Sequence, residues 1–306
     1  MTTAIDLSQL PAPQVIETID YETILVERRA YLVSLWPEEQ RAEIAARLEL
    51  ESDPLHKILQ ESAYRELVLR QRINDSARSL LLAHATGADL DNLGANPPYR
   101  VARRVIDPGD SSAVPPRARV LEPDSEYRRR IALAPEGYTT AGSQMSYLFH
   151  ALGADPDVLD ASPVSPLPGV VTVYVLSRTG DGTADEALLA AVTAALNAEH
   201  VRPMTDQVNV QSASIVSYSI EAELVIYPGP DASVVLAAAQ AAAEAYSAEQ
   251  HAMRRDVTLS GIYAALHQPG VMRVDLVQPT ANLVIGDGEA SHCTAIALTI
   301  AGATDV

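Results

Sequence analysis

The sequence predicts an α+β fold, with a helical N-terminal region, a small β-containing connector and a mixed α/β C-terminal region. Three observations support this class. A helical apolar pattern begins at Asp53-Pro54 and continues to about Ala85 without a further proline or glycine. Asn96-Pro97-Pro98 ends the helical region, because proline cannot continue a helix. The β-branched run from Val170 to Leu176 is typical of a buried strand. We place the regions at residues 1–98, 99–138 and 139–306.

The long helix is the central feature of the N-terminal region. Asp53 is a good N-cap and Pro54 suits the first helical position. A helix of about 32 residues would be about 48 Å long, more than a compact domain usually needs. Its thin apolar stripe, which contains two small alanines, requires a partner helix from the same chain or from another. The stripe consists of Leu55, Leu59, Ala63, Leu67, Ile73, Ala77 and Leu81.

Shorter elements surround this helix. An extended leader is expected at residues 5–14, and helices at residues 21–36 and 38–50. These two helices form a hairpin that covers part of the long helix. The pairs Glu61–Arg65 and Glu66–Arg70 have the favourable i,i+4 order and suit a solvated flank of the long helix.

The connector, residues 99–138, is rich in turn residues. A short strand is expected within 101–106, and Asp124-Ser125 caps a helix over 126–134. That helix carries Arg128, Arg129 and Arg130. Three adjacent arginines point in different directions around a helix, which favours surface pairing with nearby acids over a phosphate site.

The C-terminal region alternates between helical and strand patterns. A proline-rich turn is expected at 162–169. A weak internal echo, Thr139-Thr140-Ala141-Gly142 and Thr258-Leu259-Ser260-Gly261, suggests related halves at 139–212 and 213–306; chance similarity in an alanine-rich chain explains it equally well. We expect helices at 139–152, 185–198, 231–250 and 259–266, and strands at 158–161, 170–176, 207–211, 215–227, 271–277 and 295–300.

Composition excludes several classes of protein. The net charge of −18 argues against nucleic acid and anionic membranes as main partners. The charge is unevenly spread: residues 1–130 hold 17 Lys and Arg against 21 Asp and Glu, while residues 131–306 hold 5 against 19. The single cysteine, Cys293, excludes an intrachain disulfide and suits a reducing compartment. No secretory signal begins the sequence, and no apolar run is long enough for a membrane span.

The sequence shows no motif for catalysis, a metal or a cofactor. No two of the seven histidines have i,i+3 or i,i+4 spacing, and Cys293 beside His292 indicates a small buried cysteine. Gly180-Asp181-Gly182 follows a strand and precedes a helix, as a phosphate-binding loop does. It lacks the remaining residues of such motifs, and Asp181, Asp185 and Glu186 would repel a phosphate. A turn with a helix cap explains this loop better.

A set of short segments in order along the chain resembles the baseplate J proteins of contractile-tailed phages and of phage-derived particles such as R-type pyocins. Each segment alone is weak evidence for the family, but together the segments span essentially the whole sequence and their combination is specific. They are Ile5–Pro13, Leu50–Leu55, Glu61–Glu66, Gly87–Asn96, Asp124–Arg128, Ala141–Ser143, Val201–Pro203, Tyr227–Pro230, Ser260–His267 and Gly270-Val271.

The resemblance implies a structural subunit of the baseplate wedge with no cofactor. Two copies would join one copy of a second wedge protein through bundled helices, with the seven stripe residues as candidates for the bundle seam. The C-terminal region would join neighbouring wedges into a sixfold ring around the tube and spike, near other baseplate proteins, in a particle assembled in the bacterial cytoplasm. Two alternatives remain: a cytoplasmic adaptor that uses the long helix, and an enzyme with a nucleotide site at the Gly180 loop.

Overall fold

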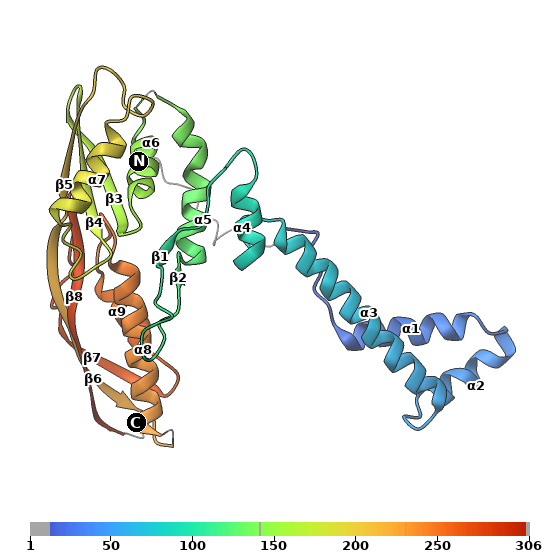
Figure 1. Cartoon of the computed structure of the whole chain (residues 1–306). Helices are drawn as coiled ribbons and strands as arrows, with labels where there is room; N and C mark the ends of the chain where they lie inside the picture. The colour runs from blue at the N-terminus through green and yellow to red at the C-terminus, as the bar shows by residue number, and fades with distance from the viewer. Residues whose placement is uncertain (1–12, 141, 230, 304–306) are drawn as a thin grey trace. The chain divides into compact units, whose positions relative to one another are not determined.

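The computed structural model describes residues 13–140, 142–229 and 231–303. Most of the predicted leader at residues 5–14 therefore lies outside the described residues, as does Ala141 of the internal echo. The chain divides into two compact units (Figure 1). The first comprises the chain up to Ala102 together with Asp124–Arg128, and the second comprises Arg103–Pro123 and the chain from Arg129. Their helices and strands confirm the predicted α+β class.

The first unit begins with three helices folded as a hairpin, residues 13–79, which we call the α1–α3 hairpin. Helices α1 (Tyr21–Ser34) and α3 (Pro54–Ser79) lie side by side, and α2 (Glu38–Leu48) closes the turn between them (Figure 1). Asp53 caps α3 by accepting a hydrogen bond from the N–H of Leu55 at 2.8 Å. The predicted start of the long helix is thus confirmed.

The long helix is shorter than the sequence predicted. Helix α3 has 26 residues and ends at Ser79, and a turn leads to α4 (Gly87–Ala95). In this turn the guanidinium of Arg128 donates hydrogen bonds to the carbonyl oxygens of Leu82 and Ala85, at 2.7 and 2.6 Å. Backbone carbonyls beyond the end of a helix need partners outside its own hydrogen-bond ladder, and Arg128 supplies two donors to them here. A contact with a residue distant in the sequence therefore favours the turn.

The connector forms a small hairpin and a helix. Strand β1 (Val105–Asp107) pairs antiparallel with β2 (Val120–Leu121), so the strand expected at 101–106 is shorter and begins later. Helix α5 (Asp124–Leu133) follows and continues into a 3₁₀ helix over Ala134–Tyr138. Asp124, expected to cap a helix that starts at residue 126, is itself the first residue of α5, and its carboxylate accepts a hydrogen bond from the N–H of Gly87.

The adjacent arginines of α5 have different partners. Arg129 pairs with the carboxylate of Asp160 at 2.9 Å, and Arg130 makes a bidentate pair with Glu122 at 2.6 and 2.7 Å. The expected pairing with acids is confirmed for these two. Arg128 instead binds the turn after α3. Arg130 is also not a surface residue, because only 8% of it is exposed.

Glu122 and Arg130 form a buried ion pair at the base of the connector. Glu122, which is 4% exposed, also accepts a hydrogen bond from the backbone N–H of Arg104 at 3.1 Å. Burial, together with the nearby charge of Arg130, lowers the pKa of Arg104 to about 10. The Arg104 guanidinium donates to the carbonyl of Asp155 at 2.8 Å, so this part of the connector is held within the second unit by charged groups that have polar partners.

The first half of the C-terminal region is a three-stranded sheet with its helices on one face. The sheet order is β3-β4-β5, where β3 is antiparallel and β5 parallel to the central strand β4. Helix α6 packs on β3 and helix α7 on β5, over a core that includes Val173 and Val192. The elements are α6 (Gln144–Ala154), β3 (Val158–Leu167), β4 (Val170–Ser177), α7 (Glu186–Leu196) and β5 (Gln207–Ser212).

The proline-rich turn predicted at 162–169 is wrong. Strand β3 continues through this stretch to Leu167, with Pro163 opposite Val173 and Val164 opposite Thr172. Because β3 is an edge strand, a proline whose missing N–H faces away from β4 removes no hydrogen bond from the sheet. Only the turn around Gly169, where φ is +76°, remains of the predicted loop.

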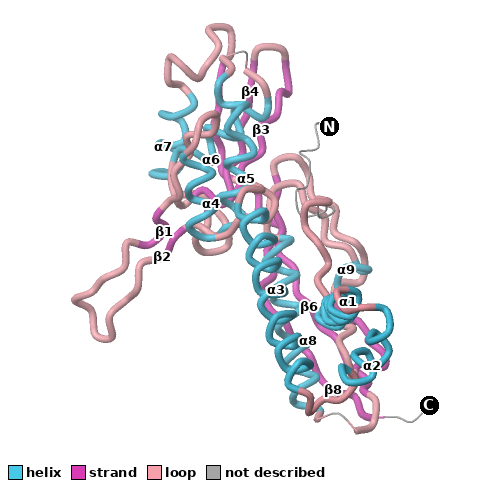
Figure 2. Tube along the Cα trace, turned by 90° about the vertical axis from the view of Figure 1, so that its right-hand side faces the viewer, coloured by secondary structure: helices cyan, strands magenta, loops and turns pink. Residues whose placement is uncertain are grey.

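The second half has the same kind of sheet. Its order is β7-β6-β8, with β7 antiparallel and β8 parallel to the central strand β6. Strands β6 and β8 lie along helix α8 (Figure 2). The predicted inward face of the long strand is confirmed, since Ile220, Ala222, Leu224 and Ile226 are all buried. The elements are β6 (Ser214–Ile226), α8 (Ala232–Gln250), α9 (Leu259–Leu266), β7 (Val271–Gln278) and β8 (Glu289–Ala303).

Both halves have a central strand with one antiparallel and one parallel neighbour, but the order of these strands along the chain differs. In the first half the antiparallel edge strand precedes the central strand, whereas in the second it follows the central strand. The matching residues of the two similar segments, 139–142 and 258–261, do not occupy equivalent positions in the two halves either. Gly142 precedes α6, while Gly261 lies inside α9, and Tyr147 is buried whereas Tyr263 is 41% exposed. Duplication of one unit stays a prediction.

A buried carboxylate joins the two halves. Asp160 of β3 is 5% exposed, and its side chain accepts hydrogen bonds from the backbone N–H of Met253 at 3.0 Å and from Arg129 at 2.9 Å. Leu176, Ala213, Met253 and Ala290 form a small apolar cluster, which draws on both sheets. The two sheets are therefore packed as one body within the second unit.

The buried ion pair gives a stability prediction. Arg130→Ala should lower the free energy of unfolding by about 3–5 kcal/mol, because it leaves the buried Glu122 carboxylate without its charge partner. Arg117→Ala is the control, since Arg117 pairs with Asp107 but its side chain is 64% exposed; its loss should be about 0–1 kcal/mol. Urea unfolding followed by far-UV circular dichroism measures both, and similar losses in the two variants would contradict the prediction.

Candidate assembly interface

The α1–α3 hairpin has its own small core. Leu59 and Ala63 of α3 are 9% and 0% exposed, and they pack with Ile24 and Leu25 of α1. Ile44 and Leu48 of α2 complete the buried cluster. Ala63 has no exposed surface because α1 and α3 approach closely at this small residue. The hairpin is therefore held together by contacts within one chain.

The structure places the seven predicted seam residues in different surroundings. Leu59 and Ala63 are buried in the hairpin, and Leu55 and Leu67 pack against the same cluster. Ile73 is 55% exposed, Ala77 is half-buried, and Leu81 lies in the turn beyond α3. Most of the α3 part of the seam thus faces α1 and α2 of its own chain. Its contact with another chain stays a prediction.

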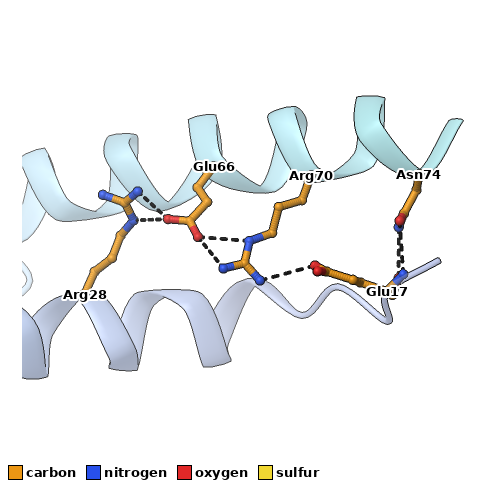
Figure 3. A network of polar contacts seen from close by, with 5 residues as sticks. All are labelled: Glu17, Arg28, Glu66, Arg70 and Asn74. Carbon is orange, nitrogen blue, oxygen red and sulfur yellow. Dashed lines mark hydrogen bonds and ion pairs between the residues drawn. The ribbon is translucent and has the colours of Figure 1, made fainter. Parts of the chain in front are cut away.

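A polar network aligns α1 along α3 (Figure 3). Glu66 of α3 accepts hydrogen bonds from Arg28 of α1 at 2.7 Å and from Arg70 at 2.9 Å. Arg70 also pairs with Glu17 at 3.4 Å. The expected solvated flank is therefore wrong for Glu66–Arg70, which faces α1, whereas the Glu61–Arg65 pair is exposed. Hydrogen bonds from Arg28 and then Arg70 hold the pKa of Glu66 below its ordinary value.

Asn74 completes the network by binding the backbone that leads into α1. Its side-chain amide donates to the carbonyl of Glu17 at 2.9 Å, and its side-chain oxygen accepts from the N–H of Glu17 at 3.0 Å. Asn74 is 3% exposed. This two-way bond with one backbone unit fixes the register of the α1–α3 hairpin, since a shift of one residue would break both hydrogen bonds.

A second apolar stripe runs along α3 beside the hairpin core. Ile58, Leu69 and Ile73 are 62%, 61% and 55% exposed. At about 100° of rotation per residue, positions eleven apart return to nearly the same direction, so the three lie within an arc of about 60°. Leu80, which is 74% exposed, follows α3 at the same eleven-residue interval from Leu69. We call Ile58, Leu69 and Ile73 the outer stripe.

Of the outer stripe, only Ile73 is among the residues predicted from the sequence. The four-residue spacing on which that prediction depends is met by Leu55, Leu59, Ala63 and Leu67, which face the hairpin core and which we call the inner stripe. The eleven-residue interval between Ile58 and Leu69 is the signal that indicates the outer stripe. A row of branched apolar side chains left exposed on a helix indicates an interaction surface better than single exposed residues do.

Other possible sites have structural explanations. Asp181 accepts a hydrogen bond from the N–H of Thr183, which lowers the pKa of its carboxyl, and Asp185 caps α7 at Leu188. A Cβ at Gly182 would come within 2.5 Å of Leu176, so little room is left there. The loop thus has the predicted form of a turn followed by a helix cap. Burial raises the pKa of the half-buried Cys293 thiol, which makes it a poorer nucleophile.

Among the residues that the structure describes, no three His, Cys, Asp or Glu side chains are grouped so that they could hold a metal ion. None of the described helices combines the length and hydropathy needed to cross a bilayer.

Comparison with known proteins gives the family. Three family models match in order along the chain: the baseplate J-like N-terminal domain at residues 51–110, the central domain at 139–212 and the C-terminal domain at 218–299. The chain is 52% identical over 290 residues to baseplate protein J of Escherichia phage P2, with 95% of each sequence covered. The chain belongs to the baseplate J-like family.

This baseplate J-like protein is a structural subunit of a phage tail baseplate, and its place is in the virion tail. The recognised family resemblance is therefore confirmed. The N-terminal domain match includes α3 and α4, and thus the outer stripe. Among solved structures, the chain resembles a protein of the sixfold-symmetrised anti-feeding prophage baseplate. That match has a TM-score of 0.41 and 16% identity over 60% of this chain and 44% of the other.

The polar network of the α1–α3 hairpin gives a pH prediction. The folded-state pKa of Glu66 is lowered, so its stabilising contribution is present above the ordinary glutamate pKa of about 4.3 and is lost as the pH falls through the folded value. Glu66→Gln should weaken the hairpin at pH 7 and remove part of its acid sensitivity. Glu61→Gln, at an exposed pair on the same helix, is the control.

Fluorescence of the single tryptophan, Trp36, between α1 and α2, reports on the α1–α3 hairpin during urea unfolding. An unchanged pH dependence of the unfolding midpoint in Glu66→Gln would show that the network does not control acid stability.

Proposed function

We propose that this protein is a wedge subunit of the baseplate, in which two copies join one copy of a second wedge protein through a bundle of helices. The outer stripe on α3 carries the proposal. The inner stripe is used within each chain, so it sets the shape of the hairpin, while Ile58, Leu69 and Ile73 are left to contact helices of other chains. Ile73 is the residue that the outer stripe shares with the seven predicted seam residues.

The charge distribution supports this assignment. Arg65 and Glu61, which flank the outer stripe, are exposed and paired with each other. Mixed charges beside a narrow apolar stripe are the pattern of a helix that pairs with other helices. The strongly acidic part of the chain lies after residue 130, away in sequence from the hairpin.

The C-terminal region, residues 139–306, has a different proposed role. It joins neighbouring wedges into a ring around the tube and spike, with other baseplate proteins in contact, and the particle assembles in the bacterial cytoplasm. Function in this scheme depends on rigid units that change partners or packing, with no bond made or broken in a substrate. Family membership and the form of the Gly180 loop favour this role over an adaptor or a nucleotide enzyme.

The outer stripe gives a direct test. Leu69→Glu should reduce co-purification of a second copy and of the second wedge protein at least tenfold. The reason is that a buried leucine contributes about 1.5–3 kcal/mol, which a charged side chain forfeits. Gln71→Glu adds the same charge two residues away, at another exposed position on the opposite side of α3, and should leave the wedge intact.

Circular dichroism of both variants checks that the hairpin is retained, which is expected because Leu69 is outside the core. Equal wedge yields from Leu69→Glu and Gln71→Glu would remove the outer stripe from the interface.

A further inference from the structure

Strand β8 forms an edge of the second sheet and carries no formal charge along nearly its whole length. It pairs with β6 from Glu289 to Ala303, and no other strand among the described residues pairs with it. After Glu289, residues 290–303 contain no Asp, Glu, Lys or Arg, in a chain whose net charge is −18. Long uncharged edge strands are rare in soluble proteins, because their free N–H and C=O groups accept another strand.

The other edges of the two three-stranded sheets have features that discourage pairing. Strand β3 contains Pro163 and Pro166. Strand β7 exposes Arg273 and Asp275, which form an ion pair at 2.8 Å. Strand β5 has six residues and begins and ends with polar side chains. Prolines, charges and short length are the known ways in which proteins protect sheet edges, so β8 is the exception.

The free part of β8 begins after Ser291. Before it, the segment that follows α8 covers the edge: Met253 bridges to Ala290, and the N–H of Arg254 donates to the carbonyl of Glu289. His251 contacts the carbonyl of Ser291. From His292 to Gly302 the strand has β6 on one side, and its side chains alternate between small outward residues and larger inward ones.

The side chains of this free part are incompletely covered. Ile296, Leu298 and Ile300 point to the core of the second half but are only half-buried, because the sheet ends beside them. Outward lie Ala295, Ala297 and Thr299, which are exposed and small. A strand placed beside β8 would cover the apolar row without meeting a bulky or charged outward side chain.

Helix α8 extends this uncharged surface. It packs on β8, and its exposed residues from Ala232 to Ala241 carry no charge. Val234 is 65% exposed, and Ala237, Ala238 and Ala241 follow it on the helix. The open edge of β8 and the uncharged surface of α8 are therefore next to each other, because α8 packs on β8.

We propose that β8 pairs antiparallel with β8 of a second copy of this chain, so that one sheet continues across two subunits. The proposal rests on the proposed function, since it names the surface by which neighbouring wedges join. A twofold axis places the same uncharged strand on both sides, which needs no complementary charges. A foreign partner of an otherwise acidic region would be expected to use basic groups against acidic ones, and β8 offers none.

Cross-linking of single cysteines tests the pairing. The full chain carries Cys293→Ala, and one cysteine is then placed at Ala295, Ala297 or Thr299. Directly opposite residues of an antiparallel pair have Cβ atoms about 4.5–5.5 Å apart, so mild oxidation of assembled baseplates should link two copies at one or two neighbouring positions. Val277→Cys, exposed on the opposite edge strand β7, is the control and should give at least tenfold less linked dimer.

Linking no stronger than the Val277→Cys control at all three positions would overturn the proposal. Linking of these positions to a different protein, or to the N-terminal residues of the same chain, would also overturn it, because the occupant of the edge would then not be a second β8.

A charge variant separates this proposal from the function on which it rests. Ala297 lies opposite Glu221 of β6, so Ala297→Lys places an ammonium beside a carboxylate and is compatible with folding. Wedges should form as in the unmodified protein, while complete rings decrease at least tenfold. Val277→Lys, the control, should retain both. Loss of wedges in Ala297→Lys with retained circular dichroism, or normal ring yield, would contradict the inference; failure of wedges in the unmodified protein would instead contradict the proposed function.

Discussion

The close approach of α1 to α3 at Ala63 decides which surface of the long helix is available to other chains. Ala63 has no exposed surface, and its small side chain lets the two helices approach each other. The network from Glu66 to Arg28 and from Asn74 to Glu17 then fixes their register. The inner stripe is covered within the chain, whereas Ile58, Leu69 and Ile73 of the outer stripe stay exposed, which is why we propose the outer stripe as the surface for other chains.

A subunit that must fold alone and later join others faces competing demands. Its apolar surfaces have to be sufficient for assembly, but each exposed one risks association at the wrong place. In the second unit the protection is uneven: prolines in β3 and the Arg273–Asp275 pair in β7 discourage pairing, while no strand of the described residues covers the outer edge of β8. In the first unit the outer stripe is flanked by the exposed Glu61–Arg65 pair, which keeps the helix solvated before assembly.

Charged groups in the interior serve attachment rather than chemistry. Glu122 holds Arg130 and the backbone of Arg104, and Asp160 holds Arg129 and the backbone of Met253. Each of these carboxylates is buried and has several donors, so neither is left to act on a substrate. Both also accept a hydrogen bond from a backbone N–H farther away in the sequence, that of Arg104 for Glu122 and that of Met253 for Asp160.

The sequence by itself determined the order and type of most elements. The Asp53-Pro54 start of α3, the buried strand at β4 and the inward face of β6 all depend on local caps, β-branched residues or period-two alternation, which act over a few residues. The family could also be recognised, because its short motifs survive in order along the chain.

Tertiary structure decided what no local pattern contains. Helix α3 ends at Ser79, and Arg128, about fifty residues away, donates hydrogen bonds to carbonyls of the turn that follows it. Strand β3 tolerates its prolines because it lies at an edge of its sheet. The apolar periodicity from which the seam was predicted is present in α3, but periodicity shows only that a helix face is apolar. Which chain covers that face depends on how closely α1 can approach it, and this distance is set by contacts between residues far apart in the sequence.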